Sequence, residues 1–315
     1  MKKIGLSVYG MSIAQGGTEK QNLNDIIEGK GIIQILSEYI DNHLEKYTND
    51  IGKERLFTFC KKEEETIRDA SGRSAGKALC GLIKTGEYGT SSELVNINTG
   101  DVYNRTTDQA DVMPFGFCII VPEGNVQNGI IVMQTLGQFG IKLALHKKMQ
   151  EIIQKIDADL FVSLGPVMPR QYVKKYFDEG VLQRISMTRF EIPQDESERY
   201  GVNYGVAQTK EERIIHKPVG FLTKKRIEVE EWMKWQRSST DIIQIDGFEY
   251  DNLKFVFKLG NTEKTINLDN LDKIVITEDI TNDVQISGGH PIFECLTPLM
   301  VKTGRSYLVG LGLVV

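Results

Sequence analysis

The sequence has few cysteines and few prolines, and both scarcities limit what the protein can be. No two of its four cysteines lie within three positions of each other. Because zinc and thiol redox sites usually show a CxxC pair, neither kind of site is predicted. We expect reduced thiols packed within strands, as is common for unpaired cysteine. Eight prolines against 30 glycines favour many tight turns over long rigid linkers.

A long apolar run is also missing. The most apolar stretch, residues 307–315, is far shorter than the roughly 20 residues of a membrane-spanning helix. After Lys2 and Lys3, the first apolar residues are interrupted at once by Gly5 and Ser7, which predicts a first strand instead of a signal peptide. We therefore expect a cytoplasmic protein with no membrane partner.

The remaining composition is that of an ordinary globular protein. Apolar residues make up 40% of the chain and charged residues 26%, and 315 residues suffice for one large domain or two of average size. The formal net charge of −5 excludes a protein that coats nucleic acid in bulk. A local basic face stays compatible with that charge, because association depends on how charges are distributed.

Hydrophobic periodicity predicts the secondary structure. Apolar residues at helical spacing indicate helices near 25–47, 136–156, 169–180 and 222–237, and a short one from Pro291. Alternating or continuous apolar runs indicate strands at 4–8, 56–60, 78–84, 93–98, 101–106, 115–121, 130–136, 160–164, 182–192, 242–245, 253–259, 265–268, 274–277 and the tail. The polar segment 63–77 is expected to be a loop.

Strands come in consecutive runs with helices between the runs. This order predicts an α+β fold with a largely antiparallel or mixed sheet and packed helices, plus a smaller α+β C-terminal region. The polar, glycine-containing stretch at about 193–212 is the expected linker. It would separate an N-terminal α+β domain, 1–195, from a C-terminal α+β domain, 212–315.

Motifs for cofactors and metals fail on spacing. Gly72 to Ala78 resembles a phosphate loop only superficially, since three residues separate its glycines and Ala78 follows the lysine where Ser or Thr is required. No two of the four histidines have metal-ligand spacing. We therefore expect no cofactor and no metal. His146 is expected to be a hydrogen-bonded histidine at the edge of a helix's apolar face.

Two histidines are the candidates for catalysis. His290 follows two glycines and precedes Pro291, so it is expected at a helix N-terminus, where the dipole favours the neutral imidazole that a general base needs. His216 is the second candidate. A capping histidine in a tight loop is the alternative for His290, because no nucleophile is visible nearby in sequence.

Charge is distributed unevenly along the chain. Lys and Arg outnumber Asp and Glu nine to five over 142–189 and eight to five over 210–237, whereas acids prevail ten to four over 240–283. Basic residues near aromatics can contact phosphates and stack bases. The candidate nucleic-acid-binding residues are Lys147, Lys148, Lys217, Lys224, Lys225, Arg226 and Trp235. The competing interpretation is a solvated helix docked by Trp232 and Trp235.

These observations favour binding over catalysis. The leading hypothesis is a non-catalytic binding or adaptor protein that acts through a protein partner, through self-association, or through DNA or RNA. One setting for it is a bacterial multi-gene system such as phage defence, although no residue indicates this. The alternative is a hydrolase or nuclease whose site is assembled only in the fold.

Overall fold

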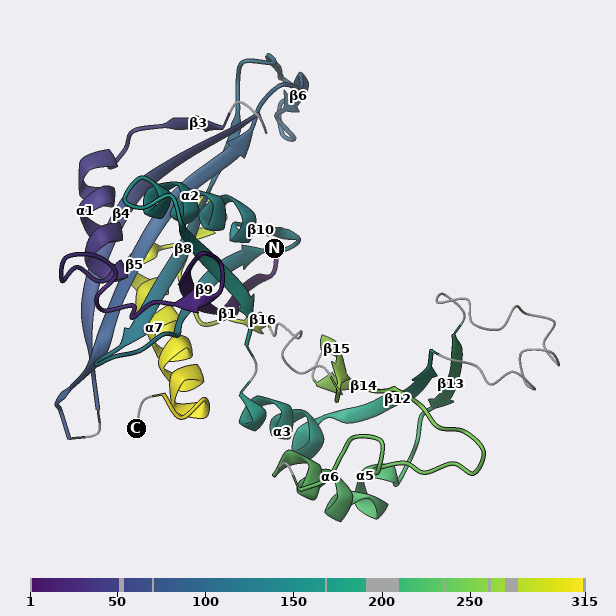
Figure 1. Cartoon of the computed structure of the whole chain (residues 1–315). Helices are drawn as coiled ribbons and strands as arrows, with labels where there is room; N and C mark the ends of the chain where they lie inside the picture. The colour runs from purple at the N-terminus through teal and green to yellow at the C-terminus, as the bar shows by residue number, and fades with distance from the viewer. Residues whose placement is uncertain are drawn as a thin grey trace. The chain divides into compact units, whose positions relative to one another are not determined.

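The computed structural model describes residues 2–50, 54–69, 71–167, 169–190, 210–234, 236–259, 262–269 and 277–313. Contacts divide the chain into two compact units. The first unit comprises Met1–Pro166 and Val275–Val315, and the second comprises Val167–Ile274. The second unit is thus an insertion between two segments that fold together (Figure 1).

The first unit is built on one antiparallel sheet, whose central strand order is β11-β1-β9-β8-β5-β4-β3. These strands are β1 (Ile4–Gln15), β3 (Thr48–Asp50), β4 (Arg55–Arg68), β5 (Ser74–Glu87), β8 (Asp111–Pro122), β9 (Gly129–Leu136) and β11 (Leu160–Pro166). Three short strands extend it: β2 (Glu19–Lys20), β10 (Phe139–Gly140) and β16 (Thr277–Asp279). Two hairpins lie outside it: β6 (Ser92–Val95) with β7 (Val102–Arg105), and β17 (Ile286–Ser287) with β18 (His290–Pro291).

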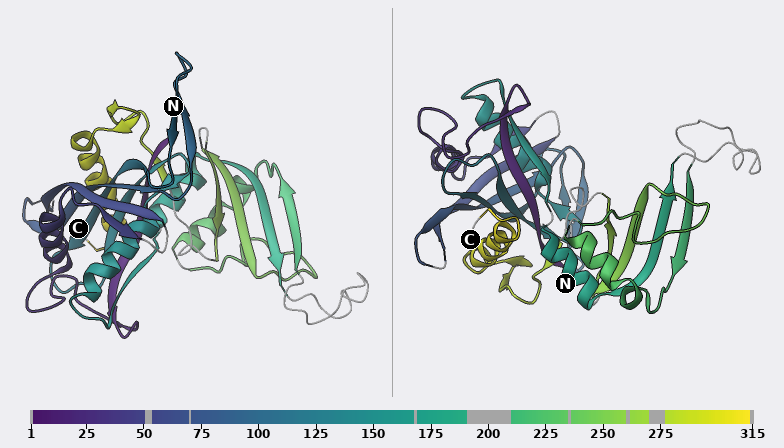
Figure 2. Two further views of the ribbon diagram at one scale, coloured as in Figure 1. Left: turned by 90° about the horizontal axis from the view of Figure 1, so that it is seen from above. Right: turned by 60° about the horizontal axis from the view of Figure 1, so that its bottom comes forward.

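Helices cover both faces of this sheet (Figure 2). Helices α1 (Ile32–His43) and α2 (Lys142–Gln154) contact each other and share one face, where the ring of Tyr39 meets Phe59 and Lys142 lies over Tyr9. Helix α7 (Phe293–Gly310) packs on the other face, mainly against β8 and β9. The sheet is therefore the middle layer of three, and its central strands are buried on both sides.

Two glycines let α7 approach the sheet closely. A Cβ on Gly304 would lie 2.5 Å from Ile120 Cδ1 and 3.1 Å from Val132 Cγ2. A Cβ on Gly116, in β8, would lie 2.5 Å from Leu296 Cδ2. Real Cβ atoms do not come within 3.0 Å of a neighbour, so a larger residue at either position would have to displace side chains between the helix and the sheet.

The second unit has its own four-stranded antiparallel sheet, in the order β13-β12-β14-β15. Its strands are β12 (Val181–Arg189), β13 (Glu211–His216), β14 (Asn252–Leu259) and β15 (Thr262–Asn267), and its helices are α3 (Arg170–Glu179), α5 (Phe221–Lys224) and α6 (Arg226–Met233). The core is aromatic. Phe177 of α3 lies 4.9 Å from Phe257 and 6.1 Å from Trp232, measured between ring centroids.

The α+β class and the largely antiparallel sheet are confirmed. The chain divides at other points than the expected linker at 193–212, because β16 pairs with β1 and α7 covers the first unit's sheet. The C-terminal segment 277–313 therefore belongs with 2–166 and does not form a C-terminal domain with 212–269. Most of the expected linker lies outside the described residues.

Three expected elements are wrong. The expected loop 63–77 is mostly strand, since β4 runs to Arg68 and pairs with β5 up to Ser74. The expected strand 242–245 has no regular secondary structure beyond a turn and a bend at its start. The tail is helical to Gly310, because Leu296, Met300 and Tyr307 recur at helical spacing and are buried against the sheet. No described helix is long and apolar enough to cross a membrane.

Candidate functional site

The expected basic middle does not form one surface within a unit. Lys147 and Lys148 lie on α2 of the first unit, whereas Lys217, Lys224, Lys225 and Arg226 belong to the second. Lys148 is largely buried, lies 2.7 Å from Glu151 and sits over the ring of Phe57. Its ammonium is therefore part of the packing of α2. Lys147 is exposed on the same helix.

Within the second unit, two of the four predicted cations are held by carboxylates. Lys225 lies 2.9 Å from Glu228, and Arg226 lies 2.8 Å from Glu230. The Glu230 carboxylate raises the pKa of Arg226. Lys217 and Lys224 are exposed. Trp235 lies outside the described residues, and Trp232 is buried in the aromatic core, as the competing interpretation expected.

The candidate histidines fall in different units. His216 ends β13 of the second unit and is exposed. His290 pairs with Ser287 in the β17–β18 hairpin, three residues before α7 begins. Its half-buried ring has a buried Nδ1 atom with no hydrogen-bond partner among the described residues. The structure thus does not bring the two histidines together within either unit. His146 bonds the carbonyl of Val162 at 2.8 Å, which confirms it as a hydrogen-bonded helix-edge histidine.

Sequence reasoning missed the most distinctive surface of the first unit, the β6–β7 arm (residues 92–105). This hairpin stands out from the end of the main sheet (Figure 1). Its cross-strand pairs are Leu94 with Tyr103 and Val95 with Val102, and all four side chains are 53–55% exposed. Successive residues of a strand face opposite ways, so each face of the arm carries one apolar pair that the described residues leave about half exposed.

The tip of the β6–β7 arm also has an exposed apolar side chain. Ile97 is 95% exposed, and the turn around it is ordered by Asn96. The Asn96 side-chain oxygen accepts from the backbone N–H of Asn98 at 2.9 Å, and its carbonyl accepts from Gly100 at 2.8 Å. The hairpin was predicted from Thr99-Gly100, and it is confirmed. A sequence signal for its exposed apolar pairs was present too, because two neighbouring apolar residues on each strand must place one apolar side chain on each face.

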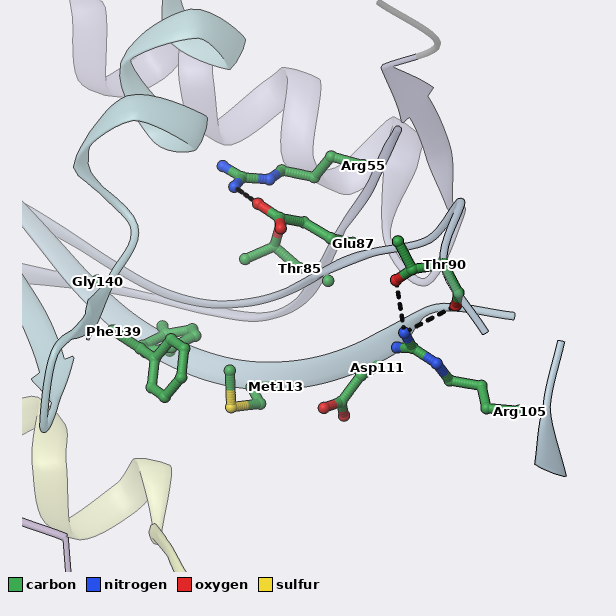
Figure 3. Close-up of a pocket in the computed structure, with 11 residues that line it drawn as sticks. Arg55, Thr85, Glu87, Thr90, Arg105, Asp111, Met113, Phe139 and Gly140 are labelled. Carbon is green, nitrogen blue, oxygen red and sulfur yellow. Dashed lines mark hydrogen bonds and ion pairs between the residues drawn. The ribbon is translucent and has the colours of Figure 1, made fainter. Parts of the chain in front are cut away.

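A pocket of about 270 Å³ lies in the first unit beside the base of the arm (Figure 3). The pairing of residues across neighbouring strands brings its lining side chains together. Arg55, Glu87 and Asp111 are cross-strand neighbours on β4, β5 and β8, so their side chains share one face of the sheet. The next row on that face contributes Thr85 and Met113.

The pocket has a polar end and an apolar end (Figure 3). Arg105 donates from Nη2 to the carbonyl of Thr90 at 3.0 Å and to its hydroxyl at 3.2 Å. Arg55 is paired with Glu87. The exposed Asp111 carboxylate makes no hydrogen bond or ion pair with the described residues. Met113 and the ring of Phe139 form the apolar end. The pocket thus combines two arginines, two carboxylates and an apolar end, and Lys2 lies over the Phe139 ring at 4.9 Å.

A second pocket of about 340 Å³ lies in the second unit between α3, α5 and α6. Its wall includes Phe177 and Val229, and its mouth holds the Arg226–Glu230 pair. Because Arg226 and Glu230 neutralise each other, neither residue offers the pocket an unpaired charge. In the described part of the chain, no group of three or more His, Cys, Asp or Glu side chains could hold a metal ion.

Comparisons with known proteins do not identify the chain. No protein-family model matches it, and no curated protein is significantly similar. Among solved structures, a PDZ domain protein from Parabacteroides distasonis aligns with 88% of this chain and 73% of its own, at 8% identity. The TM-score of 0.13 is far below the level of a shared fold, so this alignment carries no functional argument.

Proposed function

We propose that the protein is a non-catalytic binding protein that grips a protein partner with the β6–β7 arm. The observation that carries the proposal is the arm's double-sided apolar surface. Monomeric proteins seldom leave neighbouring large apolar side chains uncovered, and such patches commonly mark interaction sites. Covering the exposed half of each of these side chains would contribute about 1 kcal/mol to binding.

The arm is also held in shape at its base, which suits recognition. The Arg105 bonds to Thr90 tie β7 to the segment before β6, and the N–H of Gly89 bonds the carbonyl of Thr107 at 2.7 Å. A two-stranded hairpin has little stability of its own in water. Ordering it before binding lowers the entropy that association costs, so a shaped arm binds more tightly than a disordered one.

Charge indicates the chemistry of the partner. Residues 87–111 carry five acidic side chains, Glu87, Glu93, Asp101, Asp108 and Asp111, against the single cation Arg105. The arm together with its base is therefore acidic and partly apolar, and it fits a partner surface that is apolar and basic. In the pocket at the arm's base, Asp111 and Phe139 would accept one lysine or arginine side chain of that partner. The same acidic charge disfavours DNA or RNA as the arm's target.

The other expected functions have less support. The nucleic-acid hypothesis loses Lys148, Lys225 and Arg226 to ion pairs. The hydrolase or nuclease alternative has no supporting geometry within either unit, because His290 belongs to the first and His216 to the second. The proposal includes a cytoplasmic location, because all four cysteines are free thiols, which suits a reducing compartment. None of the described residues bears on a role in phage defence.

The proposal is tested by recovering the partner from native cells and rebuilding the complex. The tagged wild type, a Leu94→Ser/Tyr103→Ser variant and a Leu143→Ser control would be purified under identical conditions. Leu143 on α2 is 69% exposed, so the control removes an exposed apolar side chain outside the arm. The captured protein would then be purified and titrated against each variant by calorimetry, at low and high salt.

We expect the wild type and the control to bind one basic partner and the arm variant to lose it. Rising salt should weaken the complex, because opposite charges meet. Equal binding by all three proteins would contradict the proposal. So would the capture of DNA or RNA in place of a protein, with binding that survives the arm substitutions and fails when Lys217 and Lys224 are changed.

A further inference from the structure

The second unit's sheet ends in an uncovered strand. β13 is the last strand of the order β13-β12-β14-β15 and pairs only with β12 among the described residues. Four consecutive residues, Ile214 to Lys217, are exposed, with Ile214 at 44% and Ile215 at 41%. An edge strand with apolar residues and free backbone groups is a template for another strand.

We propose that β13 pairs antiparallel with β13 of a second copy, joining two four-stranded sheets across a twofold axis. This inference does not depend on the β6–β7 arm, which lies in the other unit. A second copy is the occupant because two antiparallel copies of β13 place oppositely charged residues and apolar residues opposite each other.

Geometry limits the register. A twofold axis perpendicular to the sheet keeps each face on its own side, so paired residues must have the same parity. Three registers of that kind overlap the strand well, centred on Arg213, Ile214 or Ile215. The first places Arg213 against itself, and the third places Arg213 against Lys217, so both bring like charges together.

The register centred on Ile214 brings complementary groups together. Ile214 meets its own copy on the axis, and Glu212 faces His216 of the second copy twice, once on each side. These three residues share one face of β13, because they alternate along it. The neighbouring Glu211 would face Lys217 of the second copy. No pair in this register has like charge.

The residues on the opposite face of β13 are compatible with that arrangement. Arg213 is turned into its own unit, where its guanidinium lies 3.9 Å from the centre of the Phe248 ring and its Nε lies 3.3 Å from Glu211. It therefore does not need a partner from the second copy. Ile215 would gain cover from the stem of that arginine.

The test is the oligomeric state of the full chain in sedimentation velocity over a concentration series. We expect the wild type to show a monomer–dimer equilibrium. Ile214→Lys would place two ammonium groups on the axis and should leave only monomer. Ile227→Lys is the control, since Ile227 is 68% exposed on α6 and outside the strand, and it should dimerise like the wild type.

A charge exchange tests the register itself. Glu212→Lys should weaken the dimer about tenfold, because each substitution is counted twice across the axis. Adding His216→Glu restores opposite charges and should return most of the affinity. As a measurement independent of affinity, Ile214→Cys should form an intermolecular disulfide on mild oxidation, whereas Ile227→Cys should not.

The idea is overturned if the wild type stays monomeric at every concentration, or if Ile214→Lys dimerises normally. A double variant no better than Glu212→Lys would overturn it as well, as would cross-linking of Ile227→Cys alone. A complex with a different protein on β13, with no self-association, would also count against a second copy as the occupant.

Discussion

Cys80 on β5 lies directly opposite Cys118 on β8, and both thiols are buried in the first unit's sheet with no disulfide between them. Burial raises the pKa of Cys118 well above its ordinary value, and the neighbouring Cys80 thiol raises it further. Cys118 is therefore held as a neutral thiol in the interior of the sheet. A thiol without its thiolate form is a poor nucleophile.

Thiol accessibility follows from this burial. In the folded protein we expect at most two thiols, Cys60 and Cys295, to react quickly with Ellman's reagent, and all four to react in denaturant. Cys60 should be the slower of the two, because burial raises its pKa as well. The measurement is a time course of thiol release at slightly alkaline pH. Four equally fast thiols in the native protein would contradict the placement of Cys80 and Cys118.

The depth at which α7 sits should be sensitive to side-chain size. Gly304→Val should destabilise the first unit by about 2 kcal/mol, because the new methyl groups would overlap Ile120 and Val132. The matched control is Lys302→Ala, two residues away and exposed, which should change stability by less than about 0.5 kcal/mol. Urea unfolding followed by circular dichroism compares the two. Similar midpoints for both variants would show that α7 does not pack as described.

The buried ion pair of the second unit should contribute more than its surface pairs. Arg189 pairs with Glu211, and their side chains are 8% and 17% exposed. Glu211→Gln should cost about 2 kcal/mol, because it removes a carboxylate that pairs with a buried guanidinium. Glu230→Gln breaks the exposed pair with Arg226 and should have no measurable effect.

The unfolding of the second unit can be followed separately from that of the first. Both tryptophans of the chain, Trp232 and Trp235, belong to the second unit. Urea unfolding followed by tryptophan fluorescence therefore reports on that unit alone. If both substitutions lower the midpoint equally, the distinction between the buried and the exposed pair fails.

Stability at alkaline pH should depend on Tyr250. Its hydroxyl donates to the carbonyl of Ile243 at 2.6 Å, and burial raises its pKa to about 12. The unfolded state loses this proton near pH 10, whereas the folded state keeps it until about pH 12, so stability is lost as pH rises through that window.

The corresponding variant is Tyr250→Phe. At neutral pH it should be about 1 kcal/mol less stable than the wild type, because it lacks the hydrogen bond to Ile243. The difference between the two proteins should then shrink between pH 10 and pH 12. Fluorescence-detected unfolding at several pH values measures it. A difference that stays constant over this range would show that Tyr250 titrates alike in both states.

Local patterns predicted the elements whose own residues are decisive. The hairpin around Thr99-Gly100 and the strand pair at 253–259 and 265–268 were both expected, because turn residues between apolar runs specify a hairpin within a few positions. His146 was placed at the edge of its helix because the apolar residues around it recur at helical spacing. The prediction of a loop at 63–77 was wrong because β4 continues there and pairs with β5. This pairing outweighs the loop-like composition of three consecutive glutamates.

The candidate site was less accessible to sequence reasoning. The basic residues over 142–226 are near one another along the chain, yet the fold assigns them to two units and neutralises several with neighbouring carboxylates. Arg55, Glu87 and Asp111, which line the pocket beside the arm, are up to 56 positions apart and meet only through strand register. No periodicity or spacing within the sequence encodes that meeting.

The sequence by itself determined the α+β class, the antiparallel hairpins and the thiol state, because these depend on local periodicity, turn chemistry and cysteine spacing. Only the tertiary structure decided that the chain returns after 274 to complete the first unit and that the tail is a buried helix. It also decided that the described residues leave apolar side chains of the β6–β7 arm and of β13 exposed. The reason is physical, since burial depends on which distant segment covers a surface, and that choice is made by the packing of the whole chain.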